Sequence, residues 1–381
     1  MSARVSRTVL AIVLVTGASL ALNGCIRTPD DPDRPDVESI AVQIEEDLDE
    51  FLRDGDDAGQ VRAVLVYHDG EAVLERYRGA DPEDYWDTRS VTKSVMSTLV
   101  GIAIGQGMIS GVDATLGELL PSYTAEMTPE VSAITLQRLL TQTENFPLDR
   151  SADETFWESP DWIRAILAQR AAAGPGDGAF RYSNAGPHLL SAVLVEATGR
   201  SVLEFAREYL FEPLGIPADP TTEFVMDGDD ELDGIAAYNA ADFAWPMDPQ
   251  GFHSGSTLLK LRPQDLAALG VAYLADGQSP RGDQVIPEDW VATATAQQVA
   301  GAEGELGYGY LWWTLEADGA RAFAAFGLGG QLIEVVPERD LVVVVATEYD
   351  ELDPERDLKS VSPRALTAMV SAWIAPRFAA D

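Results

Sequence analysis

The hydrophobic residues near the start of the chain follow first a helical spacing and then a strand-like pattern. From residue 37 to residue 51 the apolar positions recur every three or four residues, which predicts an amphipathic helix that ends near Gly55. Strand-like runs follow at 61–67 and 71–78, and the sequence His68-Asp69-Gly70 between them is typical of a hairpin turn. The pattern therefore predicts a helix followed by a pair of adjacent strands.

The rest of the chain divides into a helical middle and a strand-rich end. A buried helix is predicted from Ser90 to about Gly105, and residues 110–245 are mostly helical segments separated by glycine and proline. A further helix is expected at 263–274. The last third then predicts strands at 309–315, 320–326, 331–336 and 341–347, and a final helix at 363–374.

This order of elements predicts the fold class. Hairpin-length connections between the late strands imply antiparallel pairing. Strands at both ends of the chain with helices between them predict an α/β (α+β) fold. One antiparallel sheet is built from both chain ends and flanked by helices, and a mostly helical lobe is inserted. We assign residues 37–110 and 250–381 to the sheet lobe and residues 111–249 to the helical lobe.

The N-terminus has the pattern of an export signal. Arg4 and Arg7 precede an apolar run at 9–22, which is too short for a comfortable membrane span, and small residues follow it. Cys25 comes directly after Leu-Asn-Gly, which resembles the lipobox of bacterial lipoproteins, where the cysteine carries the lipid. The alternative is an ordinary secretory signal with an incidental cysteine.

The lipobox interpretation predicts where the protein is located. Residues 1–24 are the predicted lipoprotein signal peptide, and residues 25–36, rich in proline and aspartate, are a short tether. We therefore expect an exported bacterial lipoprotein that is anchored in a membrane and faces the periplasm or the cell exterior. Cys25 is the only cysteine, so the exported domain is expected to have no internal disulfide.

The net charge limits the classes of binding partner that the protein can have. The chain has 63 acidic and 26 basic residues and a formal net charge of −37, which repels nucleic acid and anionic lipid headgroups. We expect no nucleic-acid partner and no membrane contact except through the lipid anchor. The three histidines are scattered, which favours neither a metal site nor a cofactor. The oligomeric state stays open.

Ser90 and Lys93 are the first candidates for chemistry. Residues three apart share a helix face, so the amine can lie beside the hydroxyl. Lys93 is one of only three lysines in the chain. A lysine acts as a base only when uncharged, and burial together with the positive end of the helix dipole lowers its ordinary pKa of about 10.4. The alternative is a helix cap followed by a surface lysine.

Two other motifs follow further along the chain. Tyr182-Ser183-Asn184 opens a predicted helix, and Phe326-Gly327-Leu328-Gly329-Gly330-Gln331 ends a predicted strand. No Gly-x-Ser-x-Gly elbow is present, which argues against an α/β-hydrolase.

With these motifs the chain resembles the serine β-lactamase and penicillin-binding protein superfamily. The similarity is to its class C-like branch, which includes esterases, D-amino-acid peptidases and 6-aminohexanoate-dimer hydrolase. It covers roughly residues 61–347. Segments 134–143, 182–186 and 212–216 also look like recurrent parts of that branch.

The resemblance implies a role for each site residue. Ser90 is the nucleophile that becomes acylated, and Lys93 and Tyr182 share its proton. Asn184 orients Lys93 or the substrate carbonyl. The N–H groups of Ser90 and Leu328 form the oxyanion hole, and glycines such as Gly327 and Gly329 let a substrate lie against the strand edge.

One departure from the family pattern bears on the substrate. The third motif of the family usually carries Lys or His, then a small residue, then Gly, whereas this chain has Ala325-Phe326-Gly327. Without that cation the carboxylate of a β-lactam has no evident partner, so carboxylesterase or amidase activity is expected rather than β-lactamase activity. The expected substrates are small-molecule esters, amides or D-amino-acid peptides. The alternative is a catalytically idle lipoprotein that binds peptidoglycan peptides.

Four further polar residues receive ordinary structural interpretations. Glu144 and Asp149 are expected on the surface, because acidic residues are abundant in this chain. His188 is expected on a helix after the Tyr182 loop, and His253 in a loop that could reach the rim of the pocket.

Overall fold

The computed structural model describes residues 37–54, 60–146, 156–226, 231–304, 306–348 and 361–378. The predicted signal peptide, the tether, Cys25 and Asp149 lie outside these ranges. Residues Pro35–Asp381 group as one compact unit. Within the described ranges no helix combines the length and the apolar character that a membrane crossing needs. The predicted lobe boundaries stay a prediction.

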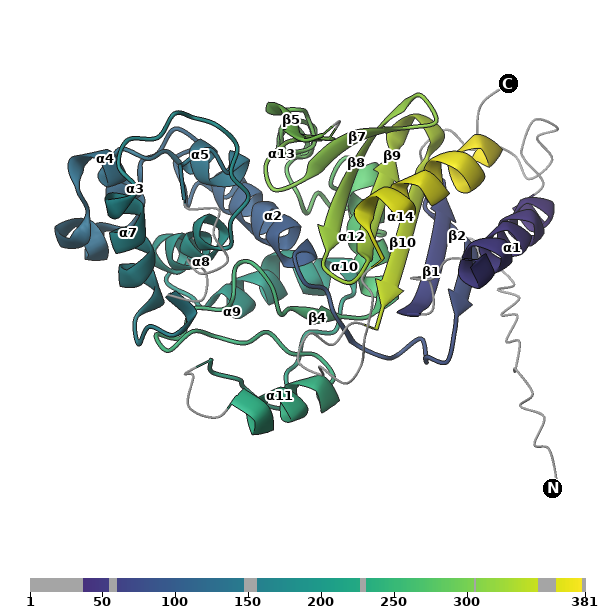
Figure 1. Cartoon of the computed structure of the whole chain (residues 1–381), viewed down its shortest axis with the longest axis horizontal. Helices are drawn as coiled ribbons and strands as arrows, with labels where there is room; N and C mark the ends of the chain where they lie inside the picture. The colour runs from purple at the N-terminus through teal and green to yellow at the C-terminus, as the bar shows by residue number, and fades with distance from the viewer. Residues whose placement is uncertain are drawn as a thin grey trace. The chain divides into compact units, whose positions relative to one another are not determined.

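Eight strands in the described ranges form one sheet in the order β2-β1-β10-β9-β8-β7-β6-β5, and every pair is antiparallel (Figure 1). Strand β1 thus pairs with the last strand, β10, and β2 pairs with β1, so both ends of the chain contribute to one sheet, as the sequence predicted. The strands are β1 (Val61–His68), β2 (Glu71–Tyr77), β5 (Val299–Glu303), β6 (Leu306–Tyr308), β7 (Trp313–Ala317), β8 (Ala320–Gly327), β9 (Gln331–Val336) and β10 (Leu341–Thr347).

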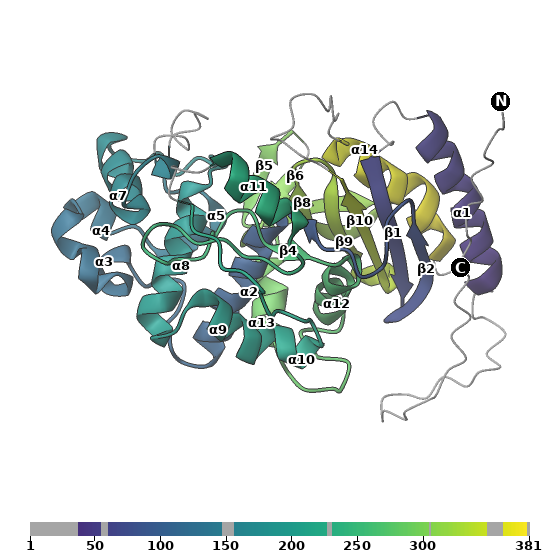
Figure 2. The ribbon, with the colours of Figure 1, turned by 90° about the horizontal axis from the view of Figure 1, so that it is seen from below.

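The central strands are buried on both faces. Every residue of β9 and β10 is buried. This explains why β10 is an almost continuous apolar run, whereas β9 also buries Gln331 and Glu334. The sheet lies between helices: Figures 1 and 2 place α12 (Pro263–Leu274) on one side of it and α14 (Pro363–Met369) on the other. The side chain that alanine would add at Gly270 of α12 would touch Val342 and Ile333, so this helix packs directly on the sheet.

Most of the helices lie in the middle of the chain and gather beside the sheet (Figure 1). Several begin with a side chain that accepts a backbone N–H; Thr135, for example, accepts from Arg138. The helices are α1 (Val37–Asp54), α2 (Val91–Gly105), α3 (Leu116–Leu119), α4 (Pro129–Ser132), α5 (Leu136–Thr141), α7 (Trp162–Ala172), α8 (Ala185–Thr198), α9 (Val202–Ala206), α10 (Glu212–Leu214), α11 (Glu231–Ala240), α12, α13 (Glu288–Ala294) and α14.

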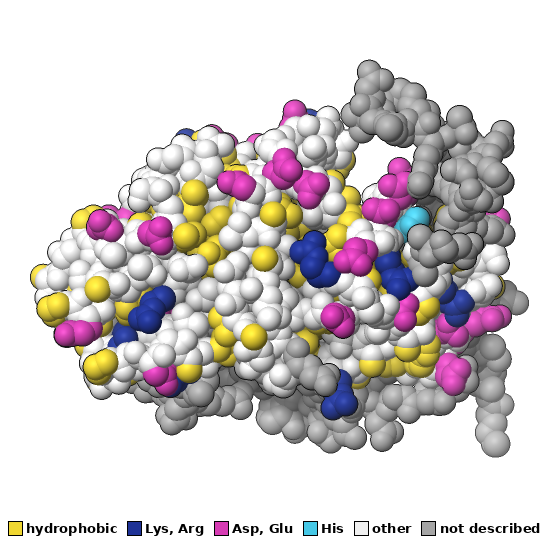
Figure 3. All heavy atoms as spheres, turned by 90° about the horizontal axis from the view of Figure 1, so that it is seen from above, with side chains coloured by type: hydrophobic (Ala, Val, Ile, Leu, Met, Phe, Trp, Pro, Cys, Tyr) yellow, Lys and Arg dark blue, Asp and Glu magenta, His cyan; other side chains and the backbone are white. Residues whose placement is uncertain are grey.

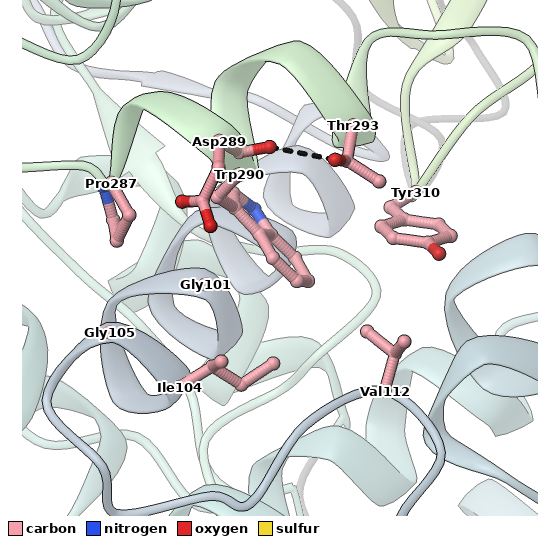
Figure 4. A pocket seen from close by; sticks show the side chains of 9 residues that line it. All are labelled: Gly101, Ile104, Gly105, Val112, Pro287, Asp289, Trp290, Thr293 and Tyr310. Carbon is pink, nitrogen blue, oxygen red and sulfur yellow. Dashed lines mark hydrogen bonds between the residues drawn. The ribbon is translucent and has the colours of Figure 1, made fainter.

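Helix α2 is enclosed along its length. Its residues from Val91 to Ala103 are all buried, both the apolar ones and the polar ones, which are Thr92, Lys93, Ser94, Ser97 and Thr98. At its C-terminal end, alanine at Gly101 would place a carbon 2.3 Å from the Trp290 ring, so glycine is what allows α13 to pack so closely. A cavity of about 330 Å³ lies there, between α2 and α13 (Figure 4). It lies at the end of α2 opposite Ser90.

The sequence placed most strands correctly but missed the sheet's far edge. Residues 309–312 precede β7, which starts at Trp313 and ends at Ala317 rather than Leu315. The edge strands β5 and β6 were not predicted, because both are short and interrupted by glycine. On the surface, acidic side chains are scattered over the face shown in Figure 3, in keeping with the net charge.

Candidate active site

Ser90 is held at the start of α2 by two short strands. Strand β3 (Trp86–Asp87) pairs with β4 (Lys260–Leu261), and the Thr88 N–H donates to the carbonyl of Leu259 at 2.9 Å. Arg89 has a φ of 51°, a conformation that non-glycine residues rarely adopt. The Asp87 carboxylate stabilises this turn, because it accepts the Arg89 N–H at 2.8 Å. Ser90 is half-buried and occupies the N-cap position of α2, but its hydroxyl makes no capping hydrogen bond.

Lys93 lies one turn further along α2 and is 1% exposed. Its Nζ is 3.0 Å from the Ser90 hydroxyl oxygen, 2.7 Å from Oδ1 of Asn184 and 2.9 Å from the carbonyl oxygen of Ser256. The Asn184 and Ser256 oxygens accept only. They take N–H groups of the lysine, whereas the Ser90 hydroxyl can either accept or donate. An uncharged Lys93 amine at this distance can therefore accept the Ser90 proton.

Tyr182 and Asn184 come from the segment before α8. Asn184 is the residue that caps this helix, and Lys93 Nζ lies 4.9 Å from the centroid of the Tyr182 ring. Gln142, which has a φ of 52°, holds the segment in place. Its side-chain oxygen accepts the Ser183 N–H at 2.6 Å, and its carbonyl accepts the Arg181 N–H at 2.8 Å. The structure thus brings Ser90, Lys93, Tyr182 and Asn184 together.

The glycine motif at the end of β8 lies against the turn that carries Ser90. Alanine at Gly327 would place a carbon 2.3 Å from the Thr88 carbonyl oxygen, so only glycine fits there. Leu328 follows and is 45% exposed, and Gly329 has a φ of 91°. Among the described residues, no protein acceptor takes the N–H of Ser90 or of Leu328. Two free donors close to the hydroxyl are what an oxyanion hole requires.

An aromatic cluster supports Tyr182. Its ring stacks on Trp313 at 5.7 Å between centroids, and Tyr308 and Phe180 pack beside the pair. Tyr308 is fully buried, and burial raises its pKa well above the ordinary value, so this phenol stays neutral. It accepts a hydrogen bond from Gln142 at 3.1 Å. The packing restricts the Tyr182 ring to one orientation.

Sequence reasoning missed Ser256 and misplaced Glu144. Ser256 contributes a backbone carbonyl, which any residue type can supply, so no sequence signal identifies it. Glu144 was expected on the surface but is fully buried, and burial raises its pKa from 4.5 to about 8. Neither carboxyl oxygen of Glu144 has a hydrogen-bond partner in the described part of the chain. Its Oε1 lies against Gly186 in the first turn of α8.

The two buried histidines, His188 and His253, are not among the proposed catalytic residues. His188 lies on α8, as predicted, and is 1% exposed. His253 is in a loop but is buried against Trp245 rather than at a rim, and burial lowers its pKa to about 4. Within the described ranges no group of three or more acidic, histidine or cysteine side chains is arranged to hold a metal ion.

Known proteins are similar to this chain in sequence and in fold. The family described as Beta-lactamase matches residues 48–364. The 6-aminohexanoate-dimer hydrolase of Paenarthrobacter ureafaciens is 24% identical over 356 residues, which cover 86% of this chain and 82% of that protein. Two solved structures have the same fold. A penicillin-binding protein homologue from Caulobacter crescentus has a TM-score of 0.65 at 18% identity and covers 90% of this chain and 98% of its own.

The second structure is EstCE1, a hydrolase with promiscuous acyltransferase activity. Its TM-score is 0.66 at 17% identity, over 89% of this chain and 99% of its own. The matched region of the family contains every candidate site residue from Ser90 to Gly329. The chain therefore belongs to the beta-lactamase family.

Proposed function

We propose that the protein is a serine hydrolase that forms an acyl-enzyme on Ser90. The Ser90 oxygen attacks a substrate carbonyl carbon, while the hydroxyl proton passes to the uncharged Lys93 amine, with Tyr182 sharing it. The proton then goes to the leaving alcohol or amine as the carbonyl–heteroatom bond breaks. Water, deprotonated by the same groups, attacks the ester on Ser90 and releases the acid. The contact between Lys93 and Ser90 at 3.0 Å carries this proposal.

The oxyanion hole is proposed at the Ser90 and Leu328 N–H groups. Charge builds up on the carbonyl oxygen in the transition state, and fixed donors stabilise it there more than in the ground state. Removing one such donor costs about 100-fold or more in rate in well-studied serine enzymes. Gly327 supports this role because its close approach to Thr88 holds the strand end beside the nucleophile.

Esters and uncharged amides are the proposed substrates. The position that is usually cationic is Ala325, which is buried on β8. Arg89 lies beside Gly327, and its guanidinium is paired with the Asp87 carboxylate at 3.2 Å, which offsets its charge. A substrate carboxylate would therefore meet no excess positive charge at these two positions. We expect short-chain p-nitrophenyl esters to be cleaved faster than the β-lactam nitrocefin, and the opposite ranking would contradict this assignment.

A fluorophosphonate probe tests the nucleophile itself. We expect the wild-type protein to be labelled and Ser90→Ala to be unlabelled, with unchanged thermal stability as the control for folding. Failure to label the wild type would favour the alternative, a catalytically idle lipoprotein that binds peptidoglycan peptides. Equal labelling of Ser90→Ala would place the nucleophile elsewhere. Export and lipidation at Cys25 remain part of the proposal, and they rest on the N-terminal pattern alone.

A further inference from the structure

His188 and Asp248 form a buried pair outside the proposed catalytic residues. They are 1% and 0% exposed, and His188 Nε2 lies 3.0 Å from Asp248 Oδ2. The other oxygen of Asp248 accepts the N–H groups of Gln250 and Phe252 at 2.9 and 2.8 Å. Both carboxylate oxygens of Asp248 thus have hydrogen-bond partners, and they fix the start of a loop that runs to Ser256.

The second nitrogen of His188 fixes the end of the same loop. The Gly255 N–H donates to His188 Nδ1 at 3.3 Å. A backbone N–H can only donate, so Nδ1 is an acceptor and the ring proton lies on Nε2, where it donates to Asp248. This assigns a neutral imidazole with a defined tautomer. Each ring nitrogen then has one partner, and both partners belong to the segment from Asp248 to Gly255.

Gly255 connects this pair to Lys93. It precedes Ser256, whose carbonyl accepts from Lys93 at 2.9 Å. Gly255 also lies so close to α8 that a side-chain carbon there would be 2.2 Å from the Pro187 carbonyl oxygen. The His188 N–H donates to the Asn184 carbonyl at 3.1 Å within the first turn of α8. The N-terminus of α8 therefore carries one acceptor of Lys93, Asn184 Oδ1, and the Gly255–Ser256 segment carries another, the Ser256 carbonyl. His188 joins these two segments.

We propose that His188, held by Asp248, is a positioning residue that fixes the Ser256 carbonyl and thereby directs the free electron pair of Lys93 at Ser90. The inference rests on the proposed function. It goes further because it makes a residue with no substrate contact responsible for the orientation of the base. Small misplacements of reacting groups lower rates strongly, by up to about 100-fold for a shift of 1 Å.

Two substitutions separate the two contacts of the His188 ring, one with Asp248 and one with Gly255. In His188→Asn the amide oxygen lies near the position of Nδ1 and still accepts from Gly255, whereas the contact with Asp248 is lost. In His188→Gln the amide group reaches the position of Nε2 and still donates to Asp248, whereas Gly255 loses its acceptor. Thr98→Val is the matched control, because it removes the buried contact of α2 with the Tyr273 hydroxyl at 2.8 Å without touching Lys93.

The measurement is the second-order rate constant of fluorophosphonate labelling as a function of pH. We expect His188→Gln to label about tenfold or more slowly, and His188→Asn to keep most of the rate. The acidic limb of the pH–rate profile of His188→Gln should also shift to lower pH. The protonated Lys93 amine is less stable once the Ser256 carbonyl no longer accepts from it, so the pKa of Lys93 falls. Thr98→Val should retain the wild-type profile even where its unfolding temperature falls.

The outcomes distinguish this inference from the proposed function. An unlabelled wild type contradicts the function itself. A labelled wild type with equal rates and unshifted profiles for both His188 variants overturns only the positioning role. If both variants fail to fold, ¹⁵N-histidine NMR of the wild type decides, since the chain has only three histidines to assign. A protonated His188, or one protonated on Nδ1 alone, would overturn the inference.

Discussion

The buried carboxyl group of Glu144 gives a prediction about stability and pH. Burial raises its pKa from 4.5 to about 8, although Arg170 and Arg138 act in the opposite direction. The folded state then binds a proton that the unfolded chain has already released. A group with a raised pKa contributes its full stability below pH 4.5, and this contribution is lost as the pH rises toward 8.

The magnitude follows from the difference between the two pKa values. One pH unit corresponds to about 1.36 kcal/mol, so the interval from 4.5 to about 8 corresponds to a loss on the order of 5 kcal/mol. Glu144→Gln keeps the shape of the side chain and removes the titration. We therefore expect the variant to gain stability relative to the wild type as the pH is raised from 5 to 9.

Urea unfolding at several pH values measures this difference. His253, whose pKa is lowered to about 4, and the buried Glu334, whose pKa is raised, also titrate differently in the folded state. Their contributions cancel in the comparison with the wild type. Exposed Glu316→Gln is the matched control and should run parallel to the wild type. A parallel curve for Glu144→Gln would show that the Glu144 carboxyl group does not bind this extra proton in the folded protein.

Two further changes test the loop and the anchor. Gly255→Ala places a carbon 2.2 Å from the Pro187 carbonyl oxygen, so we expect a loss of about 1–3 kcal/mol in unfolding free energy and slower fluorophosphonate labelling; unchanged values in both assays would contradict the close packing of this loop on α8. Cys25→Ala should move the protein from the membrane fraction to the soluble fraction with its esterase activity intact. Continued sedimentation with membranes would contradict lipidation at Cys25.

The sequence was most informative where one local pattern determines structure. Strand β10 is buried on both faces, so its almost continuous apolar run could be recognised without knowledge of the fold. The helix at Ser90 was recognised from the apolar residues that dominate its second half, from 99 to 104. Strand β5, which contains Gly301 and lies at the sheet edge, has no such run, and its pairing with β6 depends on the rest of the sheet.

In the candidate site, too, local sequence patterns predict only the contacts between residues that are close along the chain. Ser90 and Lys93 lie three positions apart, so their proximity follows from helix geometry alone. The other two acceptors of Lys93 come from residues 91 and 163 positions away, and the more distant one is a backbone carbonyl. The burial of Glu144 likewise follows from the packing of its loop on α8, and nothing in its local sequence distinguishes it from the many surface acids.

The two buried lysines of the described chain differ in the acceptors around them, and this difference separates a base from a structural cation. Lys260 donates to the carbonyls of Tyr238 and Asn239 at 3.1 and 3.2 Å and to that of Ala241. Three carbonyls accept only, so they require three N–H groups and hold Lys260 as an ammonium, even though burial lowers its pKa. The partners of Lys93 include a hydroxyl, that of Ser90, which can donate in return. The uncharged form of Lys93 therefore keeps its contacts with Ser90, Asn184 and Ser256, whereas Lys260 would lose one on deprotonation.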